Sequence, residues 1–351
     1  MADIFLRSQF NPILVPEGTN WLKIYNPAAI ADDCGQIHLF PRVAGRDMRS
    51  YIAHAVAGKE GRFVIETQPS LTPQGDNERC GLEDPRITLI DNVYHMVFAA
   101  FDGTDVELHT AVSSSLAGPW RRCGPAVPNF KFIASGGVRV RWKDGSPFEK
   151  INPKGRDHRS KSGAIFPSKI NGLYYLLFGE FRIWIATSTN GQNFDVIPGP
   201  FLAPRKGTHF FDNTFVEMGP PPIECDRGWL VLYHGVNDRF QYQLGYLILD
   251  RNDPTKILYR STQPIFGPRE IYEIADSPVD VLPGAFDVIK KKDFNSLEAF
   301  YKSVHRQNIM PQVVFCTGTI LKDDLLHLYY GVGDRMICTA VAPLADVLKS
   351  E

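Results

Sequence analysis

The sequence has little charge bias, no long apolar run and no apolar segment near residue 1, and each absence argues against a class of protein. Lys and Arg number 38 against 39 Asp and Glu, so the formal net charge is −1 at pH 7. Without a bulk cationic field, any anion or sugar must be recognised by a local site. No run approaches the roughly 18 apolar residues of a membrane span, and the N-terminus has no apolar segment of signal-peptide length. We therefore expect a cytoplasmic protein with neither nucleic acid nor a membrane as partner.

The six cysteines and the catalytic motifs that are missing exclude further classes. Cys34, Cys80, Cys123, Cys225, Cys316 and Cys338 are widely spaced and form no C-x-x-C pair, which argues against a zinc site and a disulfide scaffold. The chain also has no G-x-S-x-G, P-loop, H-E-x-x-H or G-x-G-x-x-G motif. We expect reduced cysteines, most of them in the core, and no metal or other cofactor.

Turn-forming and aromatic residues are abundant instead: Gly 29, Pro 26, Phe 23, Tyr 13 and Trp 5. Five times a Pro- or Gly-rich turn leads into a short apolar strand, then an aromatic strand, then a third strand. The aromatic strands are GQIHLFPRV, NVYHMVFAAF, GLYYLLFGEF, GWLVLYHGV and LLHLYYGVGD. Five such units predict an all-β chain, a single five-bladed β-propeller over residues 1–351, with a pair of irregular β-sandwiches as the alternative.

Two stretches interrupt this repeat. Residues 129–160 are basic and are expected to form a long loop over one face. Within residues 287–309, apolar side chains recur at near-helical spacing, which predicts a short helical insertion near residues 294–305. Its ordinary role would be to cover the edge of a blade.

In a propeller the first strand of each blade lines the central axis, so the residues that open the five units converge on one funnel. They are Asn26, Glu83, Asp84, Arg86, Lys161, Ser162, Glu217 and Gln312. Charged side chains are costly in a packed core unless they are paired, so we expect a solvated polar site at this end of the axis.

Carboxylates among these residues suggest glycoside cleavage, which needs one protonated and one ionised carboxyl on either side of the bond. Glu83 and Asp84 stand at the start of a strand with Arg86, whose charge can lower the pKa of one of them. Neighbouring strand residues point to opposite faces, so the two carboxylates are not expected to face the sugar together. An ion pair at the start of a strand is the structural alternative.

Other candidates follow aromatic strands or precede stiff turns. Glu180 follows Gly179, and Glu217 precedes a Met-Gly-Pro-Pro-Pro turn whose stiffness suits a site. Asp212 and His234 complete this set, and the Arg205–Lys206 pair can hold an anion. A solvated strand end, or an ordinary hydrogen-bonded histidine, remains the alternative for each.

The segments GLEDPRIT, KSGAIF, APRKG, FDNTFVEMGPPPI and GWLVLYHG, in this order, resemble glycoside hydrolase family 130. The resemblance extends from Asn26 to Asp334 and implies a five-bladed propeller that acts on β-mannosides with inversion, as a phosphorylase or as a hydrolase. It implies that Asp84 is the general acid, which in the phosphorylases is thought to pass its proton through a sugar hydroxyl. It also implies that Asn26, Arg42, Arg86 and Asp212 hold the terminal mannose.

The two branches of the family differ where the nucleophile enters. Glu180 and Glu217 stand where the phosphorylases carry an Arg and a Lys, so the chain resembles the hydrolase branch that cleaves β-1,2-mannosides. Each such swap turns attraction for phosphate into repulsion of about 4 kcal/mol at 4 Å and an effective dielectric of 20. We expect an inverting exo-acting β-mannosidase in which Glu180 and Glu217 orient and deprotonate water, with Lys161, Arg205 and His234 also in the substrate site. Which glutamate is the base is open.

Other residues favour the alternative, a β-mannoside phosphorylase that uses inorganic phosphate. His234 is kept where the phosphorylases use a histidine, and Arg182, Arg205 and Lys206 can form a phosphate pocket. The family usually shows an Asp or Asn near the VVF of the fifth unit, where this chain has Met310, Pro311 and Gln312, and this leaves the contacts of that unit with mannose or the aglycone open. A non-catalytic carbohydrate-binding propeller is a third hypothesis. Linkage, chain length and oligomeric state cannot be read from the sequence.

Overall fold

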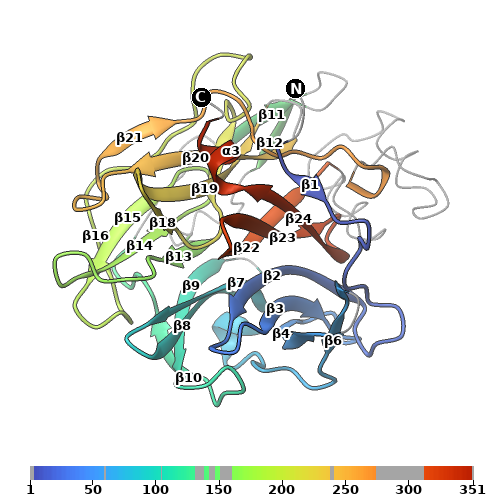
Figure 1. The fold of residues 1–351 in the computed structure, drawn as a ribbon. Coiled ribbons are helices and arrows are strands. Elements are labelled where there is room, and N and C mark those ends of the chain that lie inside the picture. The colour runs from blue at the N-terminus through green and yellow to red at the C-terminus, as the bar shows by residue number, and fades with distance from the viewer. Residues whose placement is uncertain are drawn as a thin grey trace.

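The structure is a computed structural model, which describes residues 4–58, 61–103, 105–130, 138–141, 147–150, 160–237, 241–273 and 312–349. Its strands form antiparallel sheets arranged around a common centre (Figure 1), which confirms the predicted five-bladed propeller. The first strands β2, β7, β13 and β22 contact one another around that centre. The aromatic strand of each unit is the second strand of its blade, as the sequence predicts.

The first two blades share one sheet. Blade 1 consists of β2 (Lys23–Ala31), β3 (Ile37–Ala44), β4 (Ser50–Ile52), β5 (Ala55–Ala57) and β6 (Phe63–Ile65). Blade 2 consists of β7 (Gly81–Ile90), β8 (Val93–Phe101), β9 (Val106–Ser113) and β10 (Arg121–Pro125), and the 3-10 helix η2 (Asp76–Glu78) precedes it. A short parallel pairing of β4 with β7, at Ser50 and Gly81, joins the two blades.

The remaining blades are separate sheets. Blade 3 consists of β13 (Gly163–Ile165), β14 (Tyr174–Phe178), β15 (Trp184–Ser188) and β16 (Asp195–Val196). Blade 4 consists of β17 (Phe215–Met218), β18 (Ile223–Cys225), β19 (Gly228–Val236), β20 (Tyr242–Leu249) and β21 (Ile257–Arg260), followed by the 3-10 helix η3 (Ile271–Glu273). Blade 5 consists of β22 (Val314–Lys322), β23 (Leu325–Val332), β24 (Met336–Pro343) and β1 (Leu6–Arg7), and the helix α3 (Leu344–Leu348) follows it.

Burial falls from the axis outward, as expected for blades that pack face to face. The inner strands β7 and β19 are buried on both faces, whereas the outer strands β10 and β21 are half exposed. Among the described residues, five apolar clusters each join two neighbouring blades. The cluster that contains Ile24 and Leu39 of blade 1 also contains Ile320 and Tyr329 of blade 5, so packing closes the ring.

The N-terminal strand completes the last blade. β1 pairs with β24, at Leu6 with Val341 and Arg7 with Ala340, so residues from the two ends of the chain lie in one sheet (Figure 1). The Arg7 guanidinium donates to both carboxylate oxygens of Glu273 at 2.8 Å and to the carbonyl of Gly267 at 2.7 Å. These bonds attach the first strand to the segment that follows blade 4.

Some sequence predictions can be compared with the structure only in part. The predicted helix near residues 294–305 lies outside the described residues. Within residues 129–160, the strands β11 (Val138–Arg141) and β12 (Pro147–Lys150) form an antiparallel hairpin, so this stretch is not wholly a loop. All six cysteines are unpaired, and only Cys225, Cys316 and Cys338 are buried.

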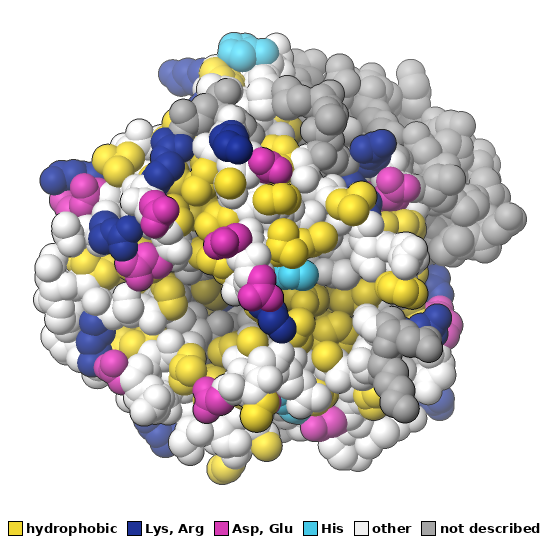
Figure 2. Space-filling view, in the orientation of Figure 1, with side chains coloured by type: hydrophobic (Ala, Val, Ile, Leu, Met, Phe, Trp, Pro, Cys, Tyr) yellow, Lys and Arg dark blue, Asp and Glu magenta, His cyan; other side chains and the backbone are white. Residues whose placement is uncertain are grey.

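The surface carries charges of both signs. Figure 2 shows basic and acidic side chains scattered over one face, without an area of a single sign, in keeping with the net charge of −1. Within the described parts of the chain, no helix is long and apolar enough to span a membrane.

Candidate active site

The first strands begin with an irregular backbone that brings polar side chains together. Asn26, Asp84, Ser162 and Gln312 occupy corresponding positions in blades 1, 2, 3 and 5, with φ of 46°, 48°, 52° and 58°. All four are almost fully buried. In β2 and β7 the strand register shifts at this point, so each has a β-bulge, which re-aims side chains and often lies beside active sites.

The bulge in β7 corrects one expectation from the sequence. Strict alternation would send Glu83 and Asp84 to opposite faces, but the left-handed backbone at Asp84 brings both carboxylates to the same two cations. Arg42 donates to Oε1 of Glu83 at 2.5 Å and to Oδ1 of Asp84 at 3.4 Å. The Lys161 ammonium lies 3.5 Å from Oε2 of Glu83 and 3.6 Å from Oδ2 of Asp84. The polar site expected from the sequence is thus a network of paired charges.

Asp84 is the most enclosed carboxylate of this network. Its side chain is 2% exposed, whereas those of Arg42 and Lys161 are 16% and 21% exposed. Asn26 donates to Oδ1 of Asp84 at 2.8 Å. Burial alone would raise the pKa of Asp84, but the charges of Lys161, Arg42 and Arg86 and the Asn26 hydrogen bond outweigh it and lower the pKa to about 2. Asp84 is therefore ionised at neutral pH when no substrate is bound.

Lys161 connects this network with the other two candidate carboxylates. Burial would lower the pKa of Lys161, but the charges of Asp84, Glu83, Glu180 and Glu217 raise it well above its usual range. One ammonium therefore lies in the field of four carboxylates. Ser162, the next residue, donates its hydroxyl to Oε1 of Glu217 at 2.6 Å. The sequence pattern alone offers Asp84, Glu180 and Glu217 as separate candidates. In the structure the charges of all three act on the same lysine.

Arg86 crosses the axis of the propeller. It donates from Nη1 to the backbone carbonyl of Asp84, from Nη2 to that of Met218 and from Nε to that of Gly219, at 2.8, 2.8 and 3.1 Å. Met218 and Gly219 belong to blade 4, so the guanidinium joins two blades that are not neighbours. The sequence places Arg86 beside the Asp84 carboxylate, whereas these three hydrogen bonds are all to backbone carbonyls. That it holds mannose stays a prediction.

His234 lies beneath the site and is fully buried. Its Nε2 accepts the backbone N–H of Cys316 at 2.9 Å, and its ring stacks on Phe315 with centroids 4.2 Å apart. Burial, with a smaller contribution from the charge of Arg86, lowers the pKa of His234 to about 3. The imidazole is therefore neutral at neutral pH and in this conformation does not offer Nε2 to a ligand.

Asp212 and Arg205 form a second buried network. Arg205 Nε donates to Oδ1 of Asp212 at 2.8 Å, while Arg260 Nη2 and the Tyr233 hydroxyl donate to Oδ2 at 2.5 and 2.7 Å. Asp212 is fully buried. The hydrogen bonds described for this network do not join it to the Asp84 network, so the predicted contact of Asp212 with mannose also stays a prediction.

Sequence reasoning missed residues that support these networks. Arg260 and Tyr233 share a carboxylate with Arg205 but stand 48 and 21 residues from Asp212, and no local pattern links them. Gly331 of β23 lies against Asn26, because a Cβ at this position would meet Asn26 Oδ1 at 2.0 Å and Asn26 N at 2.7 Å. A glycine near the end of the aromatic strand is the only sequence signal of that contact.

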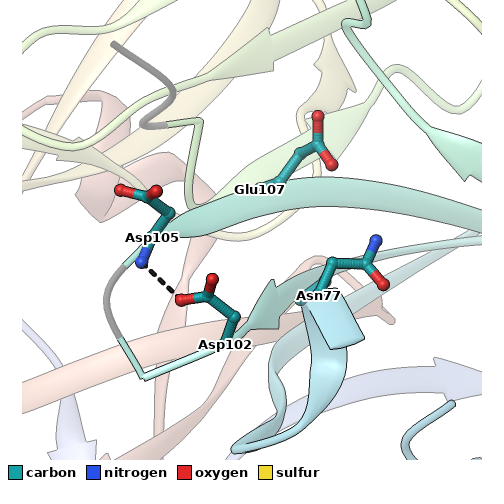
Figure 3. Close-up of a pocket in the computed structure, with 5 residues that line it drawn as sticks. Asn77, Asp102, Asp105 and Glu107 are labelled. Carbon is teal, nitrogen blue, oxygen red and sulfur yellow. Dashed lines mark hydrogen bonds between the residues drawn. The ribbon is translucent and has the colours of Figure 1, made fainter. Parts of the chain in front are cut away.

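A small acidic pocket lies away from the carboxylates described so far. Asn77, Ala100, Asp102, Asp105 and Glu107 line it at the end of β8 and the start of β9 (Figure 3). The backbone N–H of Asp105 donates to Oδ1 of Asp102 at 2.7 Å, which fixes the turn between these strands. None of the predicted site residues lines this pocket.

Comparison with known proteins identifies a family and relatives of this chain. A protein-family model for glycoside hydrolase family 130, described as beta-1,4-mannooligosaccharide phosphorylase, matches residues 12–286. A 1,2-beta-oligomannan phosphorylase of Thermoanaerobacter sp. (strain X514) is 28% identical over 350 residues, which cover 96% of both chains.

Solved structures show the same fold. A Beta-1,2-Mannobiose phosphorylase from Listeria innocua, in complex with beta-1,2-mannobiose, superimposes with a TM-score of 0.72 at 23% identity, over 99% of this chain and 98% of its own. A structure described under "The GH130 family of mannoside phosphorylases contains glycoside hydrolases that target beta-1,2 mannosidic linkages in Candida mannan" has a TM-score of 0.72 at 24% identity and covers 98% of this chain and 95% of its own.

Proposed function

The chain belongs to glycoside hydrolase family 130, and we propose that it is an inverting, exo-acting β-mannosidase that hydrolyses β-1,2-linked mannosides. The relatives named above support the substrate class, since they act on β-1,2-linked mannose. What remains to be argued from this chain's own residues is the nucleophile, which is water in a hydrolase and phosphate in a phosphorylase.

The charge around Lys161 carries the proposal. Four carboxylates, those of Glu83, Asp84, Glu180 and Glu217, lie within the field of this ammonium. Arg42 and Arg86 are the other cations that act on Asp84. With all seven groups ionised the cluster has a net charge of −1, and with Asp84 protonated, as a general acid must be, it has none. The preference for water therefore rests on Glu180 and Glu217 themselves, because each carboxylate repels a phosphate oxygen by about 4 kcal/mol at 4 Å and an effective dielectric of 20.

Two of the groups that would form a phosphate pocket are engaged elsewhere. His234 is neutral and its Nε2 accepts a backbone N–H, while Arg205 Nε donates to the buried Asp212. Arg182 and Lys206 are exposed side chains. His234, Arg205, Arg182 and Lys206 therefore add little positive charge beside Glu180 and Glu217 in this proposal.

Asp84 is the proposed general acid, and its ionised state sets a condition on the mechanism. A general acid must carry a proton, so substrate binding has to raise the pKa of Asp84 from about 2. A neutral mannoside that excludes water and separates the carboxylate from Lys161 and Arg42 would raise it. A relay through a sugar hydroxyl carries the same condition, because Asp84 must give that hydroxyl the proton that the hydroxyl passes to the leaving group. On the opposite face, Glu180 and Glu217 orient a water molecule and one of them removes its proton.

Two glutamine variants test this assignment. In Glu180→Gln and Glu217→Gln, we expect the variant that lacks the base to lose about 10²–10⁴-fold in kcat on β-1,2-mannobiose. Glu224→Gln, in which an exposed carboxylate of β18 is changed, is the matched control and should retain wild-type kcat. Proton NMR of the first product should show α-mannose. Full activity in both site variants, or β-mannose as the first product, would overturn the mechanism.

A β-mannoside phosphorylase is the second candidate. It is favoured by the names of the relatives, which include a 1,2-beta-oligomannan phosphorylase that is similar over nearly the whole chain. It predicts mannose 1-phosphate as product and no turnover without phosphate.

A further inference from the structure

Ser162 stands out among the four left-handed residues of the first strands. Asn and Asp are several-fold enriched in this backbone region, but Ser is not, so Asn26 and Asp84 fit their backbone better than Ser162 does. A serine held at φ 52° is a local strain that the surrounding structure must maintain. Such strain is concentrated at functional sites. The contact that the Ser162 side chain makes is therefore a candidate for a functional role.

The backbone around Ser162 is fixed by its own blade. The N–H of Gly179 donates to the carbonyls of both Lys161 and Ser162, each at 2.9 Å. With the backbone held in this way, the Ser162 side chain is 99% buried and its hydroxyl reaches Oε1 of Glu217 in the next blade at 2.6 Å. The contact joins blade 3 to blade 4 across the proposed nucleophile side of the site.

Lys161 and Ser162 together reach both sides of the reaction centre. The Lys161 ammonium contacts Glu83 and Asp84, on the side of the proposed acid. The Ser162 hydroxyl contacts Glu217, on the side where water would be activated. A short bond from a hydroxyl to an ionised carboxylate is stronger than a neutral hydrogen bond and restrains the oxygen that accepts it.

We propose that Ser162 is a positioning residue that orients the Glu217 carboxylate for water activation. The inference rests on the hydrolytic function proposed above and adds a residue to it. Ser162 itself exchanges no proton with the substrate. Its hydroxyl donates to Oε1 at 2.6 Å, which restrains the position of that carboxylate oxygen.

The experiment compares Ser162→Ala and Ser162→Gly with the wild type in steady-state hydrolysis of β-1,2-mannobiose from pH 4 to pH 8. Both variants remove the hydroxyl, but glycine also removes the backbone strain, because it adopts positive φ readily. We expect both to lose about 10- to 100-fold in kcat with little change in KM, as for a misplaced catalytic group. The acidic limb of their pH profile should move to higher pH, since a carboxylate without its donor is protonated more readily.

Ser261→Ala is the matched control, because Ser261 is fully buried and its hydroxyl oxygen accepts the backbone N–H of Tyr246 at 3.0 Å. It should keep the wild-type kcat and pH profile even if its melting temperature falls. Wild-type kcat and pH profile in Ser162→Gly would overturn the inference, whether or not Ser162→Ala folds. The products distinguish a failure of this inference from a failure of the proposed function. Mannose 1-phosphate from the wild type would overturn the hydrolytic proposal and this inference with it. Free mannose from the wild type and from a fully active Ser162→Gly would overturn the inference alone.

Discussion

The Asn26 side-chain amide donates to Oδ1 of Asp84 across 2.8 Å, although the two residues are 58 positions apart and belong to different blades. The bond is one of the contacts that lower the pKa of Asp84, and both residues have left-handed backbones that direct them at the axis. The Asp84 carboxylate is consequently held in place by its hydrogen bond to Asn26 and by the charges of Lys161, Arg42 and Arg86. The following predictions concern this carboxylate and the residues that hold it.

Replacing the proposed acid should abolish most of the activity. We expect Asp84→Asn to lower kcat on β-1,2-mannobiose by about 10²–10⁴-fold, the usual contribution of general acid catalysis. Steady-state kinetics measure this, with far-UV circular dichroism as a check of folding. Asp91→Asn is the control, since Asp91 is an exposed left-handed residue at a turn, where asparagine fits equally well. A rate close to that of the wild type would contradict the role of Asp84 as acid.

Asp84 should also contribute to stability in a defined pH window. Its pKa is about 2 in the folded chain against 3.8 for an unperturbed group, so the unfolded chain binds the proton more readily. The contribution, about 2 kcal/mol, is full above about pH 4 and is lost as the pH falls towards 2. Denaturant unfolding of the wild type and Asp84→Asn should show their difference in free energy shrinking across this window. A constant difference would show that the carboxylate is not held as described.

His234 should make the fold sensitive to mild acid. Burial lowers the pKa of His234 to about 3 from 6.5, so between these values the unfolded chain binds one more proton than the folded chain. Stability should then fall by about 1.4 kcal/mol for each pH unit below 6.5. His234→Gln keeps an acceptor for the Cys316 N–H but does not titrate, and its free energy of unfolding should depend less steeply on pH. An unchanged slope would mean that His234 is charged in the folded chain.

Gly331 should be required for the position of Asn26. In Gly331→Ala the new Cβ would lie 2.0 Å from Asn26 Oδ1, so the amide must move and its bond to Asp84 is disturbed. A displacement of this size should lower kcat by about 10- to 100-fold. Gly267→Ala is the control, because its Cβ would meet only the flexible side chain of Gln243, at 3.1 Å. Equal kinetics in the two variants would refute the steric argument.

Much of the fold could be predicted from the sequence because its signals are local. Aromatic strands such as Gly228–Val236 follow turn residues, and five of them are enough to indicate five blades. The side-chain directions at the site could not be predicted in the same way. The alternation of side chains between the two faces of a strand fails at Asp84, because its left-handed backbone lies in a β-bulge. The hydrophobic periodicity of the sequence gives no sign of that bulge.

Long-range pairing limited the prediction of the site as well. The guanidinium of Arg86 bonds carbonyls 132 and 133 residues away, and Asn26 depends on a glycine of the last blade. Such contacts are set by closure of the ring, not by neighbouring residues. The identity of the axial carboxylates could be read from the sequence, but the networks that hold them could not.

The identity of the nucleophile is tested most directly by the products from β-1,2-mannobiose with and without inorganic phosphate. In the proposed hydrolysis the wild-type enzyme releases free mannose at the same rate in both cases, because we expect the carboxylates of Glu180 and Glu217 beside Lys161 to repel an anion. Formation of mannose 1-phosphate, with no turnover when phosphate is left out, would contradict hydrolysis and establish the phosphorylase instead.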